Sequence, residues 1–229
     1  MERGHDYPGL WINFEAGEGG GKTTQYKVLA EYLAKKGFVV EIGREPGTTK
    51  AGEAIRNILM NPDMPELNPR TEMLLYVAAG IEFFEEKVKP VLQKGGIFIT
   101  DRWRYSTKAY QGYGLGINLG VIDTLINFSC SGAKPDMNFL LDVEAQLGLS
   151  KISGHEFSHR EDKIEARKLD YHQKVNAGYR EIARQNPGSF RVIPYIDGEP
   201  EKMQMQIQEL VDKFIKDNNL DRTLLKISG

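Results

Sequence analysis

Short apolar runs alternate with longer segments of helical periodicity along the chain. The apolar runs predict buried β-strands, and their alternation with helices predicts parallel pairing through right-handed crossovers. The expected strands span residues 10–15, 38–43, 97–100, 137–141 and 190–193. The pattern therefore indicates an α/β fold, with a parallel sheet of about five strands flanked by helices on both faces.

The segments between the strands carry start and stop signals for helices. Gly37 suits the end of the first helix, and Asn68-Pro69 supplies a cap residue and a proline for the first turn of a later one. Helices are expected at residues 21–36, 51–60, 69–79, 121–128, 163–185 and 200–216. A further helical segment begins at 106–111 and is expected to break at Gly112, Gly114 and Gly116.

Some segments depart from this alternation. The helix starting at Pro69 is apolar on more than one face, which suits the domain interior or a contact with a second subunit. Pro90 interrupts the next pattern, so residues 91–94 are expected to form a short turn. Polar, aperiodic residues 150–162 predict a mobile loop within a lid at about 145–162. Residues 1–229 are expected to form a single domain, with a short tail after about 218.

A glycine-rich stretch joins the first strand to the first helix. It consists of Ala16, Gly17, Glu18, Gly19, Gly20, Gly21, Lys22, Thr23 and Thr24. Backbone N–H groups of such a loop cradle polyphosphates, while Lys22 would reach the β- and γ-phosphates and the Thr23 hydroxyl would bind Mg²⁺. The stretch matches a Walker A loop, except that Ala16 replaces the first glycine. A flexible surface loop is the alternative, but the strand, loop and helix context favours nucleotide binding.

The charge and the cysteine content exclude several kinds of ligand and cross-link. The 30 Lys and Arg residues against 32 Asp and Glu residues give a formal charge of −2, which lacks the basic field of non-specific nucleic-acid binders. Cys130 is the single cysteine, so an internal disulfide is excluded and no zinc cluster is indicated. No apolar run suggests a membrane span or secretory signal. We expect a cytoplasmic protein with small-molecule substrates, and neither nucleic acid nor membrane as a partner.

Charged residues follow two of the expected strands, at Arg44 and at Asp101-Arg102. Because the carboxyl ends of parallel strands meet at one edge, these side chains are expected beside the Walker loop. Asp101 would hold Mg²⁺ through water, with a helix N-cap as the alternative. The two arginines would grip a second phosphate, with surface ion pairs as the alternative.

The order and spacing of a series of motifs resemble those of thymidylate kinases over about residues 10–216. The motifs are Phe14-Glu15 with the loop, Arg44-Glu45-Pro46-Gly47, 52–56, 71–75, Asp101-Arg102, 106–112, Pro135-Asp136, 141–143 and 162–165. The resemblance implies a P-loop nucleoside monophosphate kinase fold, usually a homodimer. It also implies transfer of the γ-phosphoryl group of ATP to dTMP with Mg²⁺.

The resemblance further implies roles for single residues. Arg44, Arg56 and Arg102 would surround the dTMP phosphate. Glu18 would lie near the 3′-hydroxyl of the acceptor sugar. The remaining dTMP positions are Tyr76, which would stack on thymine, Tyr110, which would disfavour a ribose 2′-hydroxyl, and Ser106, Thr107 and Gln111. By residue pattern alone, both tyrosines would be assigned to the core.

Two departures from the family pattern bear on selectivity and catalysis. Gly80 stands where the family commonly has an arginine that donates to the base, which predicts weaker thymine discrimination unless Arg104, Gln111 or water substitutes. The P-loop lacks the arginine found in some relatives, so catalytic charge is expected from the lid. There Lys151 and Arg160 are the candidates, acting with Lys22, Glu18 and Arg102.

Two other functions are compatible with these residues. One is a kinase of another pyrimidine nucleoside monophosphate or of a nucleoside, although a nucleoside has no phosphate for three arginines to hold. The other is a catalytically weak ATP-binding protein that controls a partner, which the arginine-poor lid and Ala16 motivate and the intact acceptor-side residues argue against.

Overall fold

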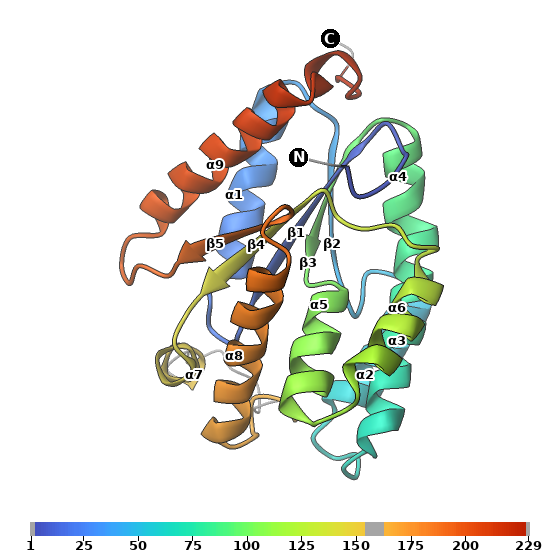
Figure 1. Ribbon diagram of the computed structural model, residues 1–229, viewed down its shortest axis with the longest axis vertical. Coiled ribbons are helices and arrows are strands. Elements are labelled where there is room, and N and C mark those ends of the chain that lie inside the picture. The colour runs from blue at the N-terminus through green and yellow to red at the C-terminus, as the bar shows by residue number, and fades with distance from the viewer. Residues whose placement is uncertain (1–2, 154–162, 228–229) are drawn as a thin grey trace.

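Five parallel strands form the central sheet of the computed structural model, which describes residues 3–153 and 163–227 (Figure 1). The strand order is β2-β3-β1-β4-β5. The strands are β1 (Leu10–Ala16), β2 (Val40–Arg44), β3 (Ile97–Asp101), β4 (Met137–Asp142) and β5 (Phe190–Pro194). The predicted α/β class and the five-stranded parallel sheet are confirmed.

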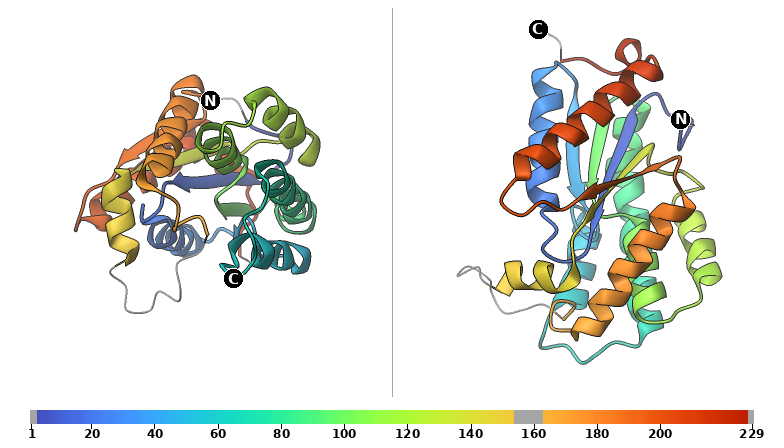
Figure 2. Two further views of the ribbon diagram at one scale, coloured as in Figure 1. Left: turned by 90° about the horizontal axis from the view of Figure 1, so that it is seen from below. Right: turned by 60° about the vertical axis from the view of Figure 1, so that its left-hand side comes forward.

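Alternate side chains of β1 enter different halves of the core, because successive residues of a strand point to opposite faces. Leu10, Ile12 and Phe14 join α1 (Lys22–Lys35) and α9 (Pro200–Asp217) in one apolar cluster. Trp11 instead packs with aromatic residues on the other face, which α3 (Pro69–Phe83), α5 (Arg104–Thr107) and α8 (Leu169–Gln185) help to cover (Figure 2). This alternation directs Glu15 to the same face as α5 and α8.

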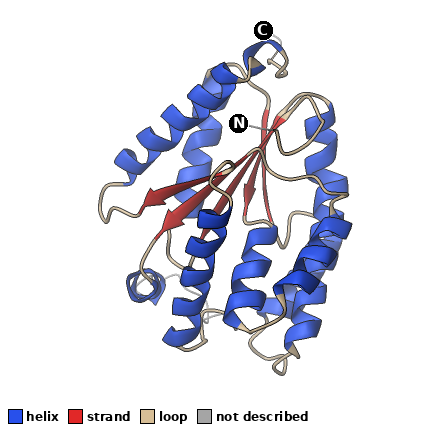
Figure 3. Cartoon of the chain, viewed as in Figure 1, coloured by secondary structure: helices blue, strands red, loops and turns tan. Residues whose placement is uncertain are grey.

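All strand arrows point toward one side of the molecule, where the helices that border the candidate site gather (Figure 3). The remaining elements are α2 (Lys50–Met60), α4 (Lys89–Gln93), α6 (Leu119–Ser129), α7 (Ala145–Ser153), the π-helices η1 (Phe84–Val88) and η2 (Lys108–Gly114), and the 3₁₀ turn η3 (Leu220–Arg222). Among the described residues, no helix combines the length and apolar character that crossing a membrane requires.

Two predicted elements differ from the structure, one in its burial and the other in the residue at which it begins. The strand predicted at 38–43 is present as β2, but its predicted burial is wrong, because β2 pairs only with β3 at the sheet edge and leaves Ile42 43% exposed. The helix predicted at 163–185 begins later, at Leu169, because Lys168 has an extended ψ of 154° and cannot continue it toward the N-terminus.

The expected breaks at prolines and glycines are wrong in two places. Helix continues through Pro90 to Gln93, because the π-turn of η1 places this residue in a first turn that needs no N–H donor. Helix also continues through Gly112 to Gly114 in η2. A Cβ on Gly112 would lie 2.5 Å from Leu119 Cδ2, so close packing explains this glycine better than a helix break.

Part of the expected lid loop is helical, since α7 covers Ala145–Ser153, and the rest of it lies outside the described residues. The tail after residue 218 also has structure. Leu220 and Leu224 are buried in the core, and Leu225 donates to Gly95 at 2.7 Å and accepts from Val39 at 3.0 Å. We refer to residues 220–227 as the C-terminal clasp.

Candidate active site

The glycine-rich loop turns from β1 into α1 beside the first turn of α7. Gly19 and Gly21 have φ angles of 65° and 75°, in the left-handed region that glycine adopts most readily. A Cβ on Gly19 would lie 2.1 Å from the Gly148 carbonyl oxygen, and one on Gly148 equally close to the Glu18 carbonyl oxygen. The loop and α7 therefore pack backbone to backbone, which only glycine permits at both positions.

Arg102, the residue directly after β3, anchors this loop by hydrogen bonds. It too has a left-handed φ, 68°, and its Nη1 donates to the Ala16 carbonyl oxygen at 2.8 Å. Its Nη2 donates to Glu18 Oε1 at 3.1 Å, and the Tyr110 hydroxyl donates to the same oxygen. Burial disfavours the charged form of Glu18, but the charges of Arg102 and Lys22 outweigh it and lower the pKa of Glu18. Glu18 is thus held as a carboxylate.

Glu15 is a fully buried carboxyl group under the same corner. Its Oε1 accepts from the Trp103 backbone N–H at 3.0 Å, and its Oε2 accepts from Ser106 at 2.6 Å and from the Tyr179 hydroxyl at 3.1 Å. Burial raises its pKa, although these hydrogen bonds oppose the shift. The network fixes the start of α5 against β1, and so fixes the backbone on both sides of Arg102.

Glu45 directly follows β2 and lines the cavity that Arg56 and Arg102 also border. It is buried, and burial together with the charge of Glu15 raises its pKa to about 8, against the opposing charges of Arg102 and Arg56. At neutral pH Glu45 is therefore largely protonated. Protonated Glu45 consequently does not neutralise the positive charge of Arg56 and Arg102, which remains available to an anion.

A cavity of about 250 Å³ opens between the loop, α2, α3 and α5. Its lining includes the predicted residues Glu18, Lys22, Thr23, Arg44, Arg56, Tyr76, Asp101, Arg102, Ser106, Thr107, Tyr110 and Gln111. Residues from six separate stretches of the chain are thus brought to one place. Of the other predicted loop residues, Ala16 ends β1, Thr24 lies in the first turn of α1, and Gly17, Gly19, Gly20 and Gly21 form the turn between them.

The two lid candidates are placed differently. Lys151 does not line this cavity, and its Nζ forms an ion pair with Asp197 at 2.5 Å on the surface. Its expected position at the transferring phosphoryl group is not seen in this conformation. Arg160 lies outside the described residues.

Asp101 and Thr23 supply oxygen atoms to the same cavity, and both suit a Mg²⁺ ion. Asp101 Oδ1 is buried without a hydrogen-bond partner among the described residues. A buried carboxylate oxygen in this state is costly unless a cation or water satisfies it. The oxygen donors therefore fit the metal that the family resemblance implies.

Several functional candidates escaped the sequence reasoning. Glu72 is buried on α3, accepts from Gln111 Nε2 at 2.8 Å and pairs with Arg167 at 2.7 Å. The hydrogen bond to Glu72 thereby fixes the orientation of the Gln111 side chain. Glu72 lies in a motif that carried the resemblance, but only the packing of α3 against η2 reveals this pairing. Similarly, Glu45 belongs to a quoted motif, and nothing in the sequence indicates its shifted pKa.

Comparisons with known proteins agree with this geometry. The family model described as thymidylate kinase matches residues 14–207. The chain is 37% identical over 216 residues to the thymidylate kinase of Roseiflexus castenholzii, covering 90% of this chain and 94% of that protein. For the thymidylate kinase of Bacillus licheniformis the identity is 34%, with 93% and 99% covered.

A solved structure shows the same similarity at the level of the fold. The crystal structure of thymidylate kinase from Ehrlichia chaffeensis superposes with a TM-score of 0.71 at 31% identity, covering 89% of this chain and 98% of that one. The sequence matches extend across the loop, the arginines and the cavity-lining helices described above. The chain belongs to the thymidylate kinase family.

Proposed function

We propose that the protein transfers the γ-phosphoryl group of ATP to dTMP, giving ADP and dTDP. The observation that carries the proposal is the single cavity in which the P-loop residues Lys22 and Thr23 meet Arg44, Arg56 and Arg102. A phosphoryl donor and a phosphorylated acceptor both need cations, and here the two sets border one space.

On the donor side, the loop N–H groups and the N-terminus of α1 bind the ATP phosphates, and Lys22 neutralises charge on the β- and γ-phosphates. Burial and the neighbouring Arg102 charge lower the pKa of Lys22, partly offset by Asp101 and Glu18. Mg²⁺, held through Thr23 and Asp101, would supply charge neutralisation on the phosphate oxygens. The transfer is direct and in line, without a covalent enzyme intermediate.

On the acceptor side, Arg56 and Arg102 hold the dTMP phosphate, with Arg44 at the rim. Arg44 pairs with Glu53 at 3.0 Å and is about half exposed, so it is the arginine most free to move onto a ligand. Glu18, kept ionised by Arg102, lies where the acceptor sugar enters. Tyr76, Tyr110, Ser106, Thr107 and Gln111 form the wall around the sugar and base.

The remaining positive charge that stabilises the transition state comes from the lid. We propose that Lys151 leaves Asp197 and, with Arg160, closes over the phosphoryl group when both substrates are bound. Exposed ion pairs stabilise proteins by only about 0–1 kcal/mol, so breaking the Lys151–Asp197 pair costs little.

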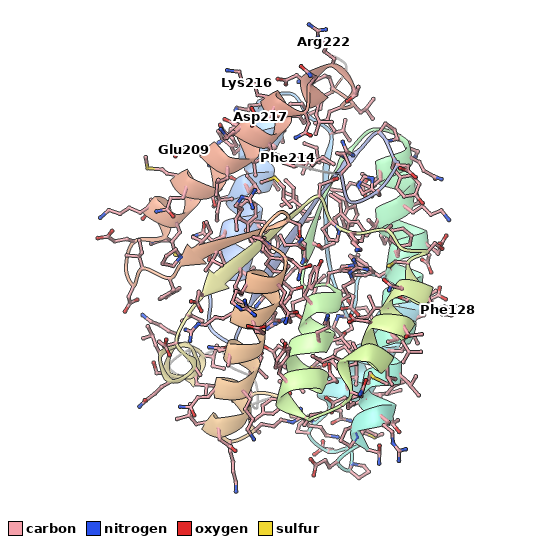
Figure 4. The ribbon with its side chains drawn as sticks, in the orientation of Figure 1. Phe128, Glu209, Phe214, Lys216, Asp217 and Arg222 are labelled. Carbon is pink, nitrogen blue, oxygen red and sulfur yellow. The ribbon has the colours of Figure 1, made fainter. Side chains whose placement is uncertain are left out.

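We also propose a homodimer. Leu74 on α3 is 51% exposed, and Val121 and Phe128 on α6 are 50% and 77% exposed. Figure 4 shows Phe128 extending outward from α6 at the edge of the molecule. The two helices lie side by side, so these side chains form one apolar face that a second copy would cover. The buried, unpaired Cys130 suits a reducing cytoplasm.

A coupled assay of ADP release across dTMP, dUMP, dCMP and thymidine, each with ATP and Mg²⁺, tests the proposal. We expect the highest kcat/KM with dTMP and little turnover of thymidine, which has no phosphate for the arginines. Turnover of thymidine above that of dTMP would favour a nucleoside kinase. Tight ATP binding without ADP release for any acceptor would favour a regulatory ATP-binding protein.

A further inference from the structure

The segment that precedes α8 forms part of the cavity wall and carries a largely buried arginine. Ile164 and Glu165 line the main cavity, and Ile164 is 5% exposed. The backbone N–H of Arg167 donates to the Ile164 carbonyl oxygen at 3.1 Å, so a tight turn joins these two residues. The Arg167 side chain is 17% exposed and does not itself line the cavity. This cation therefore lies behind the wall that the substrate would meet.

Arg167 binds the carboxylate of Glu72 on α3. Its Nη2 donates to Glu72 Oε2 at 2.7 Å, and the Glu72 side chain is only 7% exposed. The other carboxylate oxygen, Oε1, accepts from Gln111 Nε2 at 2.8 Å. Gln111 is 1% exposed and lines the main cavity. The two oxygens of one carboxylate thus connect Arg167 to a side chain of the cavity wall.

A second set of hydrogen bonds leads from Arg167 to the same helical segment. Its Nη1 donates to the Tyr171 hydroxyl at 2.6 Å, and that hydroxyl donates to the Tyr110 carbonyl oxygen at 3.4 Å. Tyr110 directly precedes Gln111 in η2. Arg167 therefore supports two neighbouring residues of η2, through one side chain from α3 and one from α8.

The ion pair with Arg167 compensates the buried charge of Glu72. A carboxylate removed from water is costly unless a cation and hydrogen bonds compensate it. Among the described residues, Arg167 forms the one ion pair of Glu72. Without this cation, Glu72 is expected to leave its present position. The Gln111 amide would then lose the acceptor that holds it.

Loss of this acceptor would free the Gln111 amide to rotate. Because Nε2 donates to Glu72, the carbonyl oxygen is the amide atom that remains available to a ligand. This oxygen can only accept, so a fixed amide distinguishes a base edge with a ring N–H from one without it. A rotating amide presents either its donors or its acceptor, and so discriminates less between the two edges.

Resting on the proposed function, we infer that Arg167 is a positioning residue for selection of the base. It acts through Glu72, which holds Gln111 in the orientation that favours thymine over cytosine. Thymine carries an N–H between its two carbonyl groups, whereas the corresponding ring nitrogen of cytosine has no proton. The segment that precedes α8 thereby contributes to the choice of acceptor nucleotide.

Equilibrium binding of dTMP, dCMP and ATP to the intact protein and its variants tests this inference. Arg167→Met removes the charge and the donors and leaves an unbranched side chain. We expect binding of dTMP to weaken by about tenfold, with the affinities for dCMP and ATP changed by less than about threefold. Arg167→Lys restores a cation for Glu72 without the planar fork, and should recover most of the affinity for dTMP.

Glu72→Leu keeps the test open if Arg167→Met does not fold. This replacement removes the acceptor of Gln111 and leaves no buried carboxylate behind. Arg167, at 17% exposed, can turn its charge toward water. We therefore expect Glu72→Leu to show the same selective loss of dTMP binding.

Arg184→Met is the matched control, because Arg184 pairs with Glu181 at 2.7 Å on the surface of α8 and does not line the main cavity. Its replacement should leave all three affinities unchanged. An equal weakening of dTMP and dCMP in Arg167→Met would assign Arg167 a structural role and overturn the inference. Unchanged affinities in Arg167→Met or in Glu72→Leu would also overturn it. Because binding is measured without turnover, failure of the proposed phosphoryl transfer would appear separately, in the ADP-release assay.

Discussion

Arg102 donates to Glu18 at 3.1 Å and so connects the end of β3 to the phosphate-binding loop. Its second terminal nitrogen donates to the Ala16 carbonyl oxygen at 2.8 Å. The side chain proposed to hold the acceptor phosphate therefore also fixes the loop that binds the donor. One guanidinium couples the positions of the two substrates.

This coupling predicts a large effect of Arg102→Lys, because lysine keeps the charge but cannot hold Glu18 and Ala16 at once. We expect kcat/KM for dTMP to fall about 100-fold, with a weaker affinity for ATP as well, measured by steady-state kinetics and ATP titration. Arg180→Lys is the control, since Arg180 pairs with Asp142 and Glu144 on an exposed surface. A defect confined to dTMP would contradict the coupling.

Glu45 predicts a pH dependence of stability. Its pKa is raised from 4.5 to about 8, so the folded protein binds this proton more tightly than the unfolded chain. The stabilising contribution is complete below pH 4.5 and is lost as the pH rises through 8. Within this window, each pH unit lowers the free energy of unfolding by up to about 1.4 kcal/mol.

Glu45→Gln removes this titration. Chemical denaturation should give similar unfolding free energies for both proteins at pH 5, with the variant more stable at pH 9. In the parent, KM for dTMP should also rise above pH 8 as the Glu45 carboxylate forms beside Arg56 and Arg102. Parallel pH profiles for the two proteins would show that Glu45 is not the group responsible.

Gly148→Ala should displace the phosphate-binding loop. Alanine normally stabilises a helix interior relative to glycine by about 1 kcal/mol, but here its Cβ would lie 2.1 Å from the Glu18 carbonyl oxygen. We expect a loss of about 2 kcal/mol or more in unfolding free energy and at least a tenfold weaker ATP affinity. Gly188→Ala is the control, because a Cβ there meets nothing within 4 Å.

Phe128→Asp should produce a monomer, because it introduces a charge into the apolar face of α3 and α6. Sedimentation velocity of the parent and of the variant would test for the proposed dimer and measure its loss. Met205→Asp is the control, since Met205 is 60% exposed on α9, away from this face. A monomeric parent protein, or an unchanged dimer in the Phe128 variant, would rule out this interface.

Lys151→Ala should lower kcat about tenfold or more without changing the melting temperature, since its pair with Asp197, the one ion pair it forms among the described residues, is exposed. Asp197→Asn releases the same lysine and should leave kcat equal or higher, as measured at saturating substrates. Unchanged turnover in Lys151→Ala would remove Lys151 from the lid mechanism, and the same experiment on Arg160 would then decide its role.

Much of the fold was predictable because apolar runs and caps are local signals. The strands, their parallel pairing and the strand, loop and helix context of Lys22 follow from such signals. The resemblance to a family also placed Arg44, Arg56 and Tyr76, which cavity geometry brings together although no local pattern links them.

What escaped prediction depends on tertiary contacts. Pro90 and Gly112 look like helix breakers, but π-turns and close packing accommodate them. The shifted pKa of Glu45 arises from burial beside Glu15, two residues that are distant in sequence.

The C-terminal clasp has a consequence for self-association. An open sheet edge offers free backbone groups to strands of other molecules and so promotes aggregation. The clasp occupies the backbone of Gly37 and Val39 just before β2, by hydrogen bonds of 2.7 and 3.0 Å. Beyond the clasp, only the short strand from Val40 to Arg44 has an open edge. The charge of the exposed Glu41 disfavours pairing of a strand from another molecule there. The clasp thus limits intermolecular β-pairing at the β2 edge of the sheet.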